Sequence, residues 1–401
     1  MSAIPVGAAQ QRPNSNSLAD KASALFDILR KNTVETENAR RVHEDNVRAI
    51  HDAGLFRLSS PKRFGGEEAT LRETLGVTSE IARACGSTGW VSALINVCSW
   101  LVSLYPEQTQ QEVFGSSADT RIAGVIAPKA STEKTDGGYV ITGSWPWASG
   151  SLHASWVLVG FPMVDDAGKQ VDQGLALIPS SDITIKDTWF SIGMRGTGSN
   201  TIVADKAFVP NHRVLSLSKA IEGKYLTPYS DTEPLYRSAF CPVLATVLVG
   251  PVLGLARAAL DVFTERLPGR GIQYTWYEKQ SEAAVTHLQI AEAAMKIDTA
   301  HLHAYRAADD IDRAAAAGMY PDHAARARIR MDCGYAVNAA KEAVNLLFSA
   351  TGGSAAAEFN HLQRVWRDVN TASLHGILAY TTNLELYGRS LLQLEPNTPL
   401  I

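Results

Sequence analysis

The spacing of apolar residues changes twice along this chain, and this limits the folds it can adopt. Up to about residue 120, apolar side chains recur every three or four positions, as in amphipathic helices. Between about 121 and 210, short runs of β-branched and aromatic residues are separated by Gly, Pro, Asp and Ser, which is typical of short strands. Helical spacing then returns and continues to the C-terminus. The order predicts helices, then a small β domain, then more helices.

We therefore expect a mainly α protein with a small antiparallel β domain. Its expected segments are a disordered N-terminus over 1–17, a helical domain over 18–120, a central β domain over 121–235 and a C-terminal four-helix bundle over 236–401. The expected bundle helices cover 240–266, 281–317, 322–351 and 358–392.

Charge and cysteine usage exclude several classes of protein. The net charge of -4, the pI near 6.2 and the lack of a dense basic run argue against a nucleic-acid partner. The four cysteines are widely spaced and lack metal-ligand spacing, so we expect reduced thiols in the cytoplasm and no metal site. The polar first 17 residues lack the pattern of a cleaved secretion signal.

One apolar stretch, 240–259, raises the question of a membrane span. It contains Pro242, Pro251 and Arg257, which suit a buried bundle helix better than a membrane helix. We therefore expect no membrane association.

Residues 143–150 (GSWPWASG) lie between two strand-like runs and are expected to connect them. Trp145 and Trp147 flank a proline, and Ser149 comes next in a small, flexible Ala-Ser-Gly segment. Two indoles with one hydroxyl suit a flat heteroaromatic ligand. On composition alone, packing on a sheet face and an ordinary turn are the alternative.

Two glycine-rich stretches are further candidates for ligand contacts. Residues 193–199 (GMRGTGS) precede strand-like sequence, so they do not form a nicotinamide-binding unit. They either bring backbone amides, Arg195 and Ser199 to a ligand or form a plain β turn. Gly352 and Gly353 separate two predicted helices, where exposed amides would also suit a phosphate.

Among the histidines, His375 is the most informative. We place it in the last long helix, seven residues after Asp368 and therefore about 10 Å along the axis, too far for the carboxylate to orient the ring. A structural histidine bonded to a carbonyl is the alternative. Gly376 beside it costs helix stability and indicates close packing at this point.

The domain order resembles the acyl-CoA dehydrogenase fold over 18–401. Several motifs inside that fold are similar to the oxygenase components of two-component (group D) flavin monooxygenases, which hydroxylate hydroxyphenylacetate, steroid-derived phenols and indoles. The motifs are 87–90 (STGW), 143–150, 193–199, 350–353 (ATGG), Arg367 and Asp368 with His375, and 398–401 (TPLI).

One position separates the two branches of this fold. Many acyl-CoA dehydrogenases carry a catalytic Glu-Gly shortly after the Arg-Asp pair, where this chain has His375 and Gly376. A glutamate can remove a proton, whereas a histidine can donate a hydrogen bond to a peroxide. The replacement favours oxygenation. The alternatives are an acyl-CoA dehydrogenase, an N-hydroxylase of an amine or amino sugar, and a helical scaffold without catalysis.

The resemblance implies a flavin cofactor supplied in reduced form, FADH2 or FMNH2, by a separate NAD(P)H-dependent reductase. O2 then forms a C4a-hydroperoxide, with Ser149 at the flavin N5 edge and His375 supporting the peroxide as catalytic residues. The expected cofactor contacts are Trp147, Ala148, Ser149, Arg195, Ser199, Gly352, Gly353 and, for the phosphate, Arg266 or Arg270 across a subunit boundary.

The resemblance also places a substrate pocket beside the predicted helix 90–104, which is apolar almost all round and would exclude water. Trp90, Asn96 and Cys98 are the expected substrate contacts. Family members that bind phenols use polar side chains near the position of Cys98, where this chain offers only Asn96, Cys98 and Ser99. Because of this departure, the resemblance also allows an indole, another electron-rich ring or an amine. A cytoplasmic homotetramer acting on an aromatic small molecule is expected.

Overall fold

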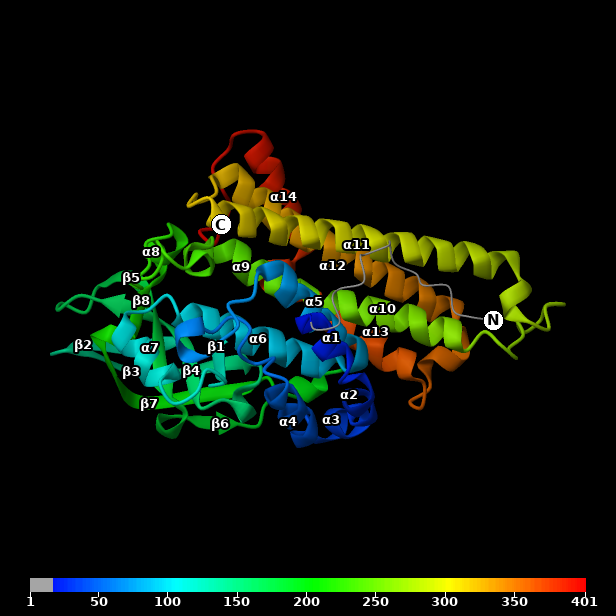
Figure 1. Cartoon of the computed structure of the whole chain (residues 1–401), viewed down its shortest axis with the longest axis horizontal. Coiled ribbons are helices and arrows are strands. Elements are labelled where there is room, and N and C mark those ends of the chain that lie inside the picture. The colour runs from blue at the N-terminus through cyan, green and yellow to red at the C-terminus, as the bar shows by residue number, and fades with distance from the viewer. Residues whose placement is uncertain (1–16) are drawn as a thin grey trace.

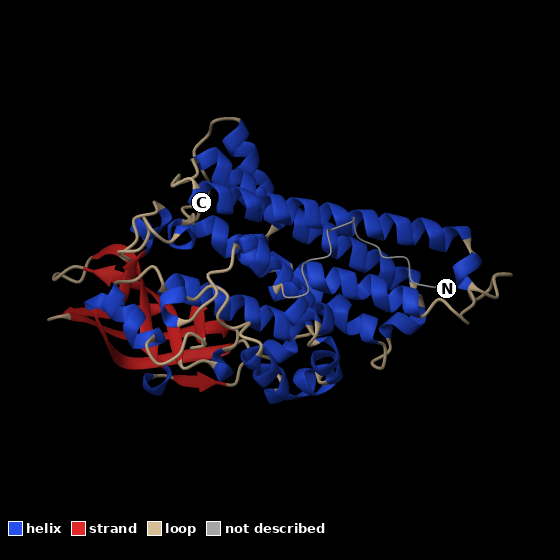
Figure 2. Ribbon diagram, in the orientation of Figure 1, coloured by secondary structure: helices blue, strands red, loops and turns tan. Residues whose placement is uncertain are grey.

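The computed structural model describes residues 17–401, and it is mostly helical with the strands gathered at one end (Figures 1 and 2). The predicted disorder over 1–17 concerns residues that, except for Ser17, lie outside the described part. Ser17 caps the first helix: its hydroxyl accepts a hydrogen bond from the amide of Asp20. The expected fold class, mainly α with a small β domain, is confirmed.

Seven α-helices form the described N-terminal part, from residue 17 onward. α5 begins with a capping box between Thr70 and Glu73, and α6 is buried on every side except at Leu94. The expected apolar, buried helix is thus present. The bounds are α1 (Leu18–Ser23), α2 (Phe26–Lys31), α3 (Thr33–Ala39), α4 (Glu44–Asp52), α5 (Leu71–Ala84), α6 (Gly86–Val102) and α7 (Glu107–Phe114).

The β domain consists of two four-stranded sheets, ordered β1-β4-β5-β8 and β2-β3-β7-β6. β1 pairs in parallel with β4, and the other pairs are antiparallel. β2 and β8 were not expected from the sequence. The bounds are β1 (Ile122–Val125), β2 (Ala130–Thr135), β3 (Gly138–Ala148), β4 (Trp156–Val164), β5 (Gln170–Pro179), β6 (Thr184–Lys186), β7 (Asn200–Pro210) and β8 (Val214–Ser216).

The tryptophan stretch is a strand, so the expected connection over 143–150 is wrong for most of its length. β3 runs through it to Ala148, with a register shift between Trp145 and Ala148. Trp145 is fully buried in the domain core, where its Nε1 donates to the carbonyl of Gly160 at 2.8 Å. Trp147 is 65% exposed. The predicted wall of two indoles does not exist.

The bundle is built from helices that extend away from the sheets, α11 and α12 being the longest (Figure 1). The first expected helix is interrupted at Leu248. The helix expected over 358–392 is two helices, because the backbone leaves the helical path after Ala372 and a 3₁₀ turn follows. The bounds are α9 (Phe240–Val247), α10 (Val249–Glu265), α11 (Ala284–Ala316), α12 (His323–Ala350), α13 (His361–Ala372) and α14 (Tyr380–Leu391).

His375 therefore precedes the turn Gly376–Leu378 instead of lying within a helix. The close packing predicted at Gly376 is also wrong, since no atom lies within 4 Å of the position that a Cβ would take there. Gly376 lies beside open space, next to the imidazole.

Within residues 17–401, one helical stretch, Phe240–Glu265, is long and apolar enough to cross a membrane. Of its most apolar window, 94% is buried inside the protein, so it is a core helix of the bundle, as predicted.

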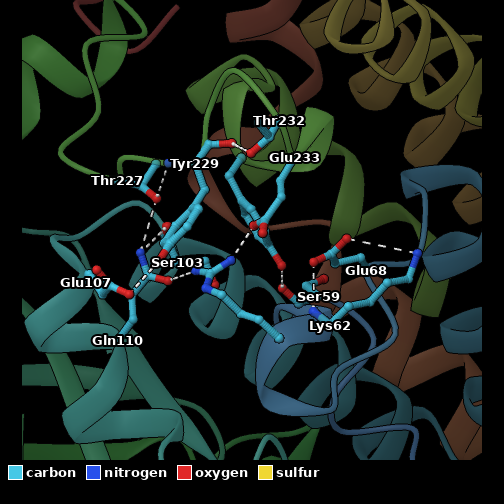
Figure 3. A network of polar contacts seen from close by, with 12 residues as sticks. Ser59, Lys62, Glu68, Ser103, Glu107, Gln110, Thr227, Tyr229, Thr232 and Glu233 are labelled. Atoms are coloured by element: carbon cyan, nitrogen blue, oxygen red, sulfur yellow. Dashed lines mark hydrogen bonds and ion pairs between the residues drawn. The ribbon is translucent and has the colours of Figure 1, made fainter.

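Polar contacts hold the segment between β domain and bundle against the N-terminal helices (Figure 3). The Tyr229 hydroxyl donates to Glu107 at 2.5 Å, and the Gln110 amide donates to Thr227 at 3.2 Å. The Arg63 guanidinium lies 3.8 Å from the centre of the Tyr229 ring. The network therefore joins the loop that follows α8 (Leu217–Ile221) to α7 and to Arg63.

Candidate active site

Trp90, on α6, joins the two residues predicted to be catalytic. Its indole Nε1 donates to Ser149 Oγ at 3.3 Å. Its ring centroid is 5.9 Å from that of His375, with the planes tilted by 58°. The three side chains come from α6, from the turn after β3 and from the turn after α13. The fold thus brings together residues separated by more than half of the chain.

A chain of hydroxyl groups continues from Ser149 into the loop 193–199. Ser149 Oγ and Ser199 Oγ are 2.6 Å apart, as are Ser199 Oγ and Thr197 Oγ1. Thr197 Oγ1 donates to the Met194 carbonyl at 2.8 Å. Ser199 was predicted, but Thr197 was missed. The available signal was its place between Gly196 and Gly198, in a motif for which ligand contact was one of the two predicted roles.

The loop carrying these hydroxyls is fixed by its backbone. Met194 has a left-handed φ of 52°, and its amide donates to Asp368 Oδ1 at 2.5 Å. Arg367 contacts the Ile192 carbonyl. A Cβ on Gly193 would collide with the carbonyl of Arg367. The Arg-Asp pair of α13 therefore holds the loop, a role that sequence reasoning did not assign.

Burial sets the protonation states of His375 and Asp368. The His375 residue as a whole is exposed, but partial burial of its ring lowers the pKa below the ordinary value, so the imidazole is neutral at pH 7. Burial raises the pKa of Asp368 to about 6, opposed by the Met194 amide and by Arg367. A neutral imidazole offers one donor and one acceptor.

Three predicted cofactor residues lie around the Ser149 cluster. Trp147 is exposed and lies under the Lys129 ammonium, which is 5.5 Å from the ring centroid. The methyl group of Ala148 is buried in the β-domain core, so only its backbone is available to a ligand. Arg195 belongs to the fixed loop and donates to the Ser191 carbonyl at 3.2 Å.

The remaining predicted cofactor residues lie where α10 and α12 end. Gly352 has a φ of 69°, and a Cβ on either Gly352 or Gly353 would meet no atom within 4 Å, so this backbone is open to a ligand. Arg270 donates to Ser354 Oγ at 3.0 Å beside it. Arg266 is the C-terminal cap residue of α10. Within residues 17–401, no hydrogen bond joins this group directly to Ser149.

Of the predicted substrate residues, the structure brings only Trp90 to the cluster. The Asn96 amide is occupied by the backbone: Oδ1 accepts from the Leu58 amide, and Nδ2 donates to the Leu55 carbonyl, both at 2.9 Å. Cys98 faces Gly124 on β1, and burial raises the pKa of its thiol to about 12. Helical spacing did not separate these two from the face that carries Trp90.

Comparison with known proteins shows where this arrangement belongs. Residues 18–116 match the family "Acyl-CoA dehydrogenase, N-terminal domain", and residues 246–380 match "Acyl-CoA dehydrogenase, C-terminal domain". The oxygenase subunit HsaA of a flavin-dependent monooxygenase from Rhodococcus jostii (strain RHA1) is 36% identical, over 88% of this chain and 93% of its own length.

Two further relatives are also flavin-dependent proteins. The oxygenase component of the FADH2-dependent resorcinol hydroxylase from Rhizobium sp. (strain MTP-10005) is 31% identical over 97% of both chains. The structure of XiaF from Streptomyces sp., in complex with FADH2 and glycerol, matches with a TM-score of 0.91 and 35% identity, covering 95% of this chain and 96% of that one. This chain therefore belongs to the flavin-dependent monooxygenases of the acyl-CoA dehydrogenase fold, as an oxygenase component that uses reduced flavin.

Proposed function

We propose that this protein uses reduced flavin and O2 to hydroxylate an aromatic or heteroaromatic small molecule of the phenol or indole type. The observation that carries the proposal is the position of Trp90, which contacts Ser149 through its N–H and His375 through its ring. Relatives named for resorcinol and for indole-3-acetate support both substrate types.

The chemistry of the site suits a reduced flavin. Trp147 offers an exposed indole for stacking, Ser149 offers an oxygen at the ring edge, and Arg195 adds positive charge on a fixed loop. Gly352 and Gly353, with Arg266 or Arg270, offer open amides and a cation for phosphate. When bound, a reduced flavin supplies the two electrons that activate O2. Both FADH2 and FMNH2 carry a phosphate that these groups could bind, so the proposal covers both.

In this proposal the residues of the chain position and shield the reaction. The buried helix α6 and the Trp90 ring exclude water. His375, neutral at pH 7, donates one hydrogen bond to the oxygen being transferred. An acyl-CoA dehydrogenase would instead need a carboxylate base at this position, which His375 does not provide.

Electrons come from a separate NAD(P)H-dependent reductase, since the chain has no nicotinamide-binding motif. The proposed protein is a cytoplasmic homotetramer. The outer face of α11 supports association between copies. Leu288, Met295 and Leu302 recur there every seven residues and are exposed by about two thirds or more. A stripe of this spacing is suited to packing against a helix of another copy.

Anaerobic titration with FADH2 and with FMNH2, followed by an oxygen pulse in the presence of phenols and indoles, tests this function. We expect tight binding of one reduced flavin and a product carrying one added oxygen atom. Bleaching of bound oxidised FAD by an acyl-CoA, with no oxygenated product, would overturn the proposal in favour of a dehydrogenase.

A further inference from the structure

Three short oxygen-oxygen contacts lie in sequence beside the proposed flavin site. They join Ser149 to Ser199 at 2.6 Å, Ser199 to Thr197 at 2.6 Å, and Thr197 to the Met194 carbonyl at 2.8 Å. All three hydroxyl-bearing side chains are buried. Oxygens this close repel each other unless a hydrogen lies between them. Each contact therefore requires one hydrogen.

Three hydroxyl hydrogens are available for the three contacts, and this fixes which oxygen donates in each hydrogen bond. Each of the three hydroxyls has one hydrogen, while the Met194 carbonyl has none to give. That carbonyl also accepts from the indole of Trp189 at 2.9 Å and from the Thr197 amide at 3.1 Å, so it can only be an acceptor. Thr197 must donate to Met194, Ser199 to Thr197, and Ser149 to Ser199.

Ser149 therefore has no hydrogen left for a ligand. Its oxygen already accepts one hydrogen bond from Trp90 Nε1 at 3.3 Å, and one lone pair remains. Toward the site, Ser149 is a hydrogen-bond acceptor only. A hydroxyl without this chain behind it could serve as either donor or acceptor.

We propose that Thr197 and Ser199 determine redox-state specificity, because they hold Ser149 as an acceptor and so favour reduced over oxidised flavin. The inference rests on the proposed function, in which Ser149 meets the N5 edge. Reduced flavin carries a hydrogen on N5 and can donate it to Ser149. Oxidised flavin has a lone pair there, so binding it would turn the Ser149 hydrogen away from Ser199 and leave one of the three contacts without a hydrogen.

Thr197→Val tests this directly, because it removes the hydroxyl while keeping the shape of the side chain. Ser199 can then donate to Ser149, which frees the Ser149 hydrogen for oxidised flavin. We expect the affinity for oxidised FAD to rise by roughly tenfold relative to that for reduced FAD, the worth of one buried hydrogen bond. The two-electron potential of the bound flavin should fall by about 30 mV for each tenfold change.

The dissociation constants are measured by flavin fluorescence for oxidised FAD and by anaerobic titration for dithionite-reduced FAD, with FMN in parallel. Ser199→Ala should change the ratio in the same direction, and Thr197→Ser should restore it. Thr201→Val is the matched control: it removes a buried hydroxyl 2.8 Å from Thr188, in the loop after β6 and outside the chain of contacts, and should leave the ratio unchanged.

A ratio that stays the same in both Thr197→Val and Ser199→Ala would overturn the inference, as would equal weakening of both redox states, which indicates only a structural role. An equal response to Thr201→Val would also overturn it. These results would overturn the inference alone, because the parent protein would still bind reduced flavin. Failure of the proposed function is a different outcome, in which the parent protein binds no reduced flavin, and it would overturn both.

Discussion

Asp368 holds the loop of the candidate site through the Met194 amide, and its raised pKa makes the stability of the protein depend on pH. Asp368→Asn tests both effects. The carboxyl group is buried on α13 and accepts the Met194 amide at 2.5 Å. An asparagine keeps an acceptor oxygen for this amide but removes the ionisable group. The variant therefore separates the hydrogen bond from the charge.

The magnitude follows from the pKa of this group. Burial raises the pKa of Asp368 from 3.8 to about 6, so the folded protein holds its proton more tightly than the unfolded chain does. Stability from this group is fully present below about pH 4 and is lost as pH rises to about 6. The difference between the two pKa values corresponds to roughly 3 kcal/mol of unfolding free energy. The asparagine variant should lack this decrease.

Urea unfolding, followed by tryptophan fluorescence at a fixed protein concentration, measures the effect at about pH 4.5, 5.5 and 6.5. The depressed pKa of His375 gives an opposite pH dependence, but it acts in both proteins and cancels in the difference. Asp187→Asn, at an exposed carboxylate paired with Arg40, is the control and should keep the parent pH dependence over this range.

The same slope in parent and Asp368→Asn between about pH 4.5 and 6.5 would refute the reasoning. It would mean that Arg364 and Arg367, which both pair with Glu37 beside the site, neutralise the Asp368 carboxylate as well. The reasoning would also be refuted if the stability of the parent rose with pH over this range and Asp368→Asn abolished the rise. The pH dependence from Asp368 would then have the opposite sign.

Three further predictions concern the cluster itself. His375→Ala should increase H2O2 release at the expense of product, measured with a peroxide assay beside product chromatography. Since the pKa of His375 is lowered to about 4, the ratio of product to H2O2 in the parent should not change from about pH 6 to 8. Trp90→Phe removes the donor to Ser149 but keeps the ring, and should weaken reduced-flavin binding roughly fivefold in anaerobic titration. Trp147→Ala should shift the free energy of unfolding by less than about 0.5 kcal/mol, because the side chain is exposed, yet lower flavin affinity about fivefold.

Periodicity was sufficient to predict the order of helical and β segments, although not β2 and β8, because most helices and strands bury one face along their own length. It did not predict the break between α13 and α14. No proline marks that position, and the apolar spacing continues across it, so Gly376 was the one local signal of the turn that places His375 beside Trp90. The Asp368 contact was hidden for a similar reason, since its partner is a backbone amide 174 residues away.

The failed two-indole wall shows why a site on a strand depends on register. Alternation would place Trp145 and Trp147 on the same face of β3, yet one is fully buried and the other 65% exposed. The register shift between Trp145 and Ala148 turns the backbone, and Trp147 takes a left-handed φ of 67°. That turn leaves the indole outside and brings Ser149 inward, under Trp90 of α6. The bulge therefore leaves Trp147 exposed at the edge of the site and Ser149 buried, and the indole that hydrogen-bonds to this serine comes from α6.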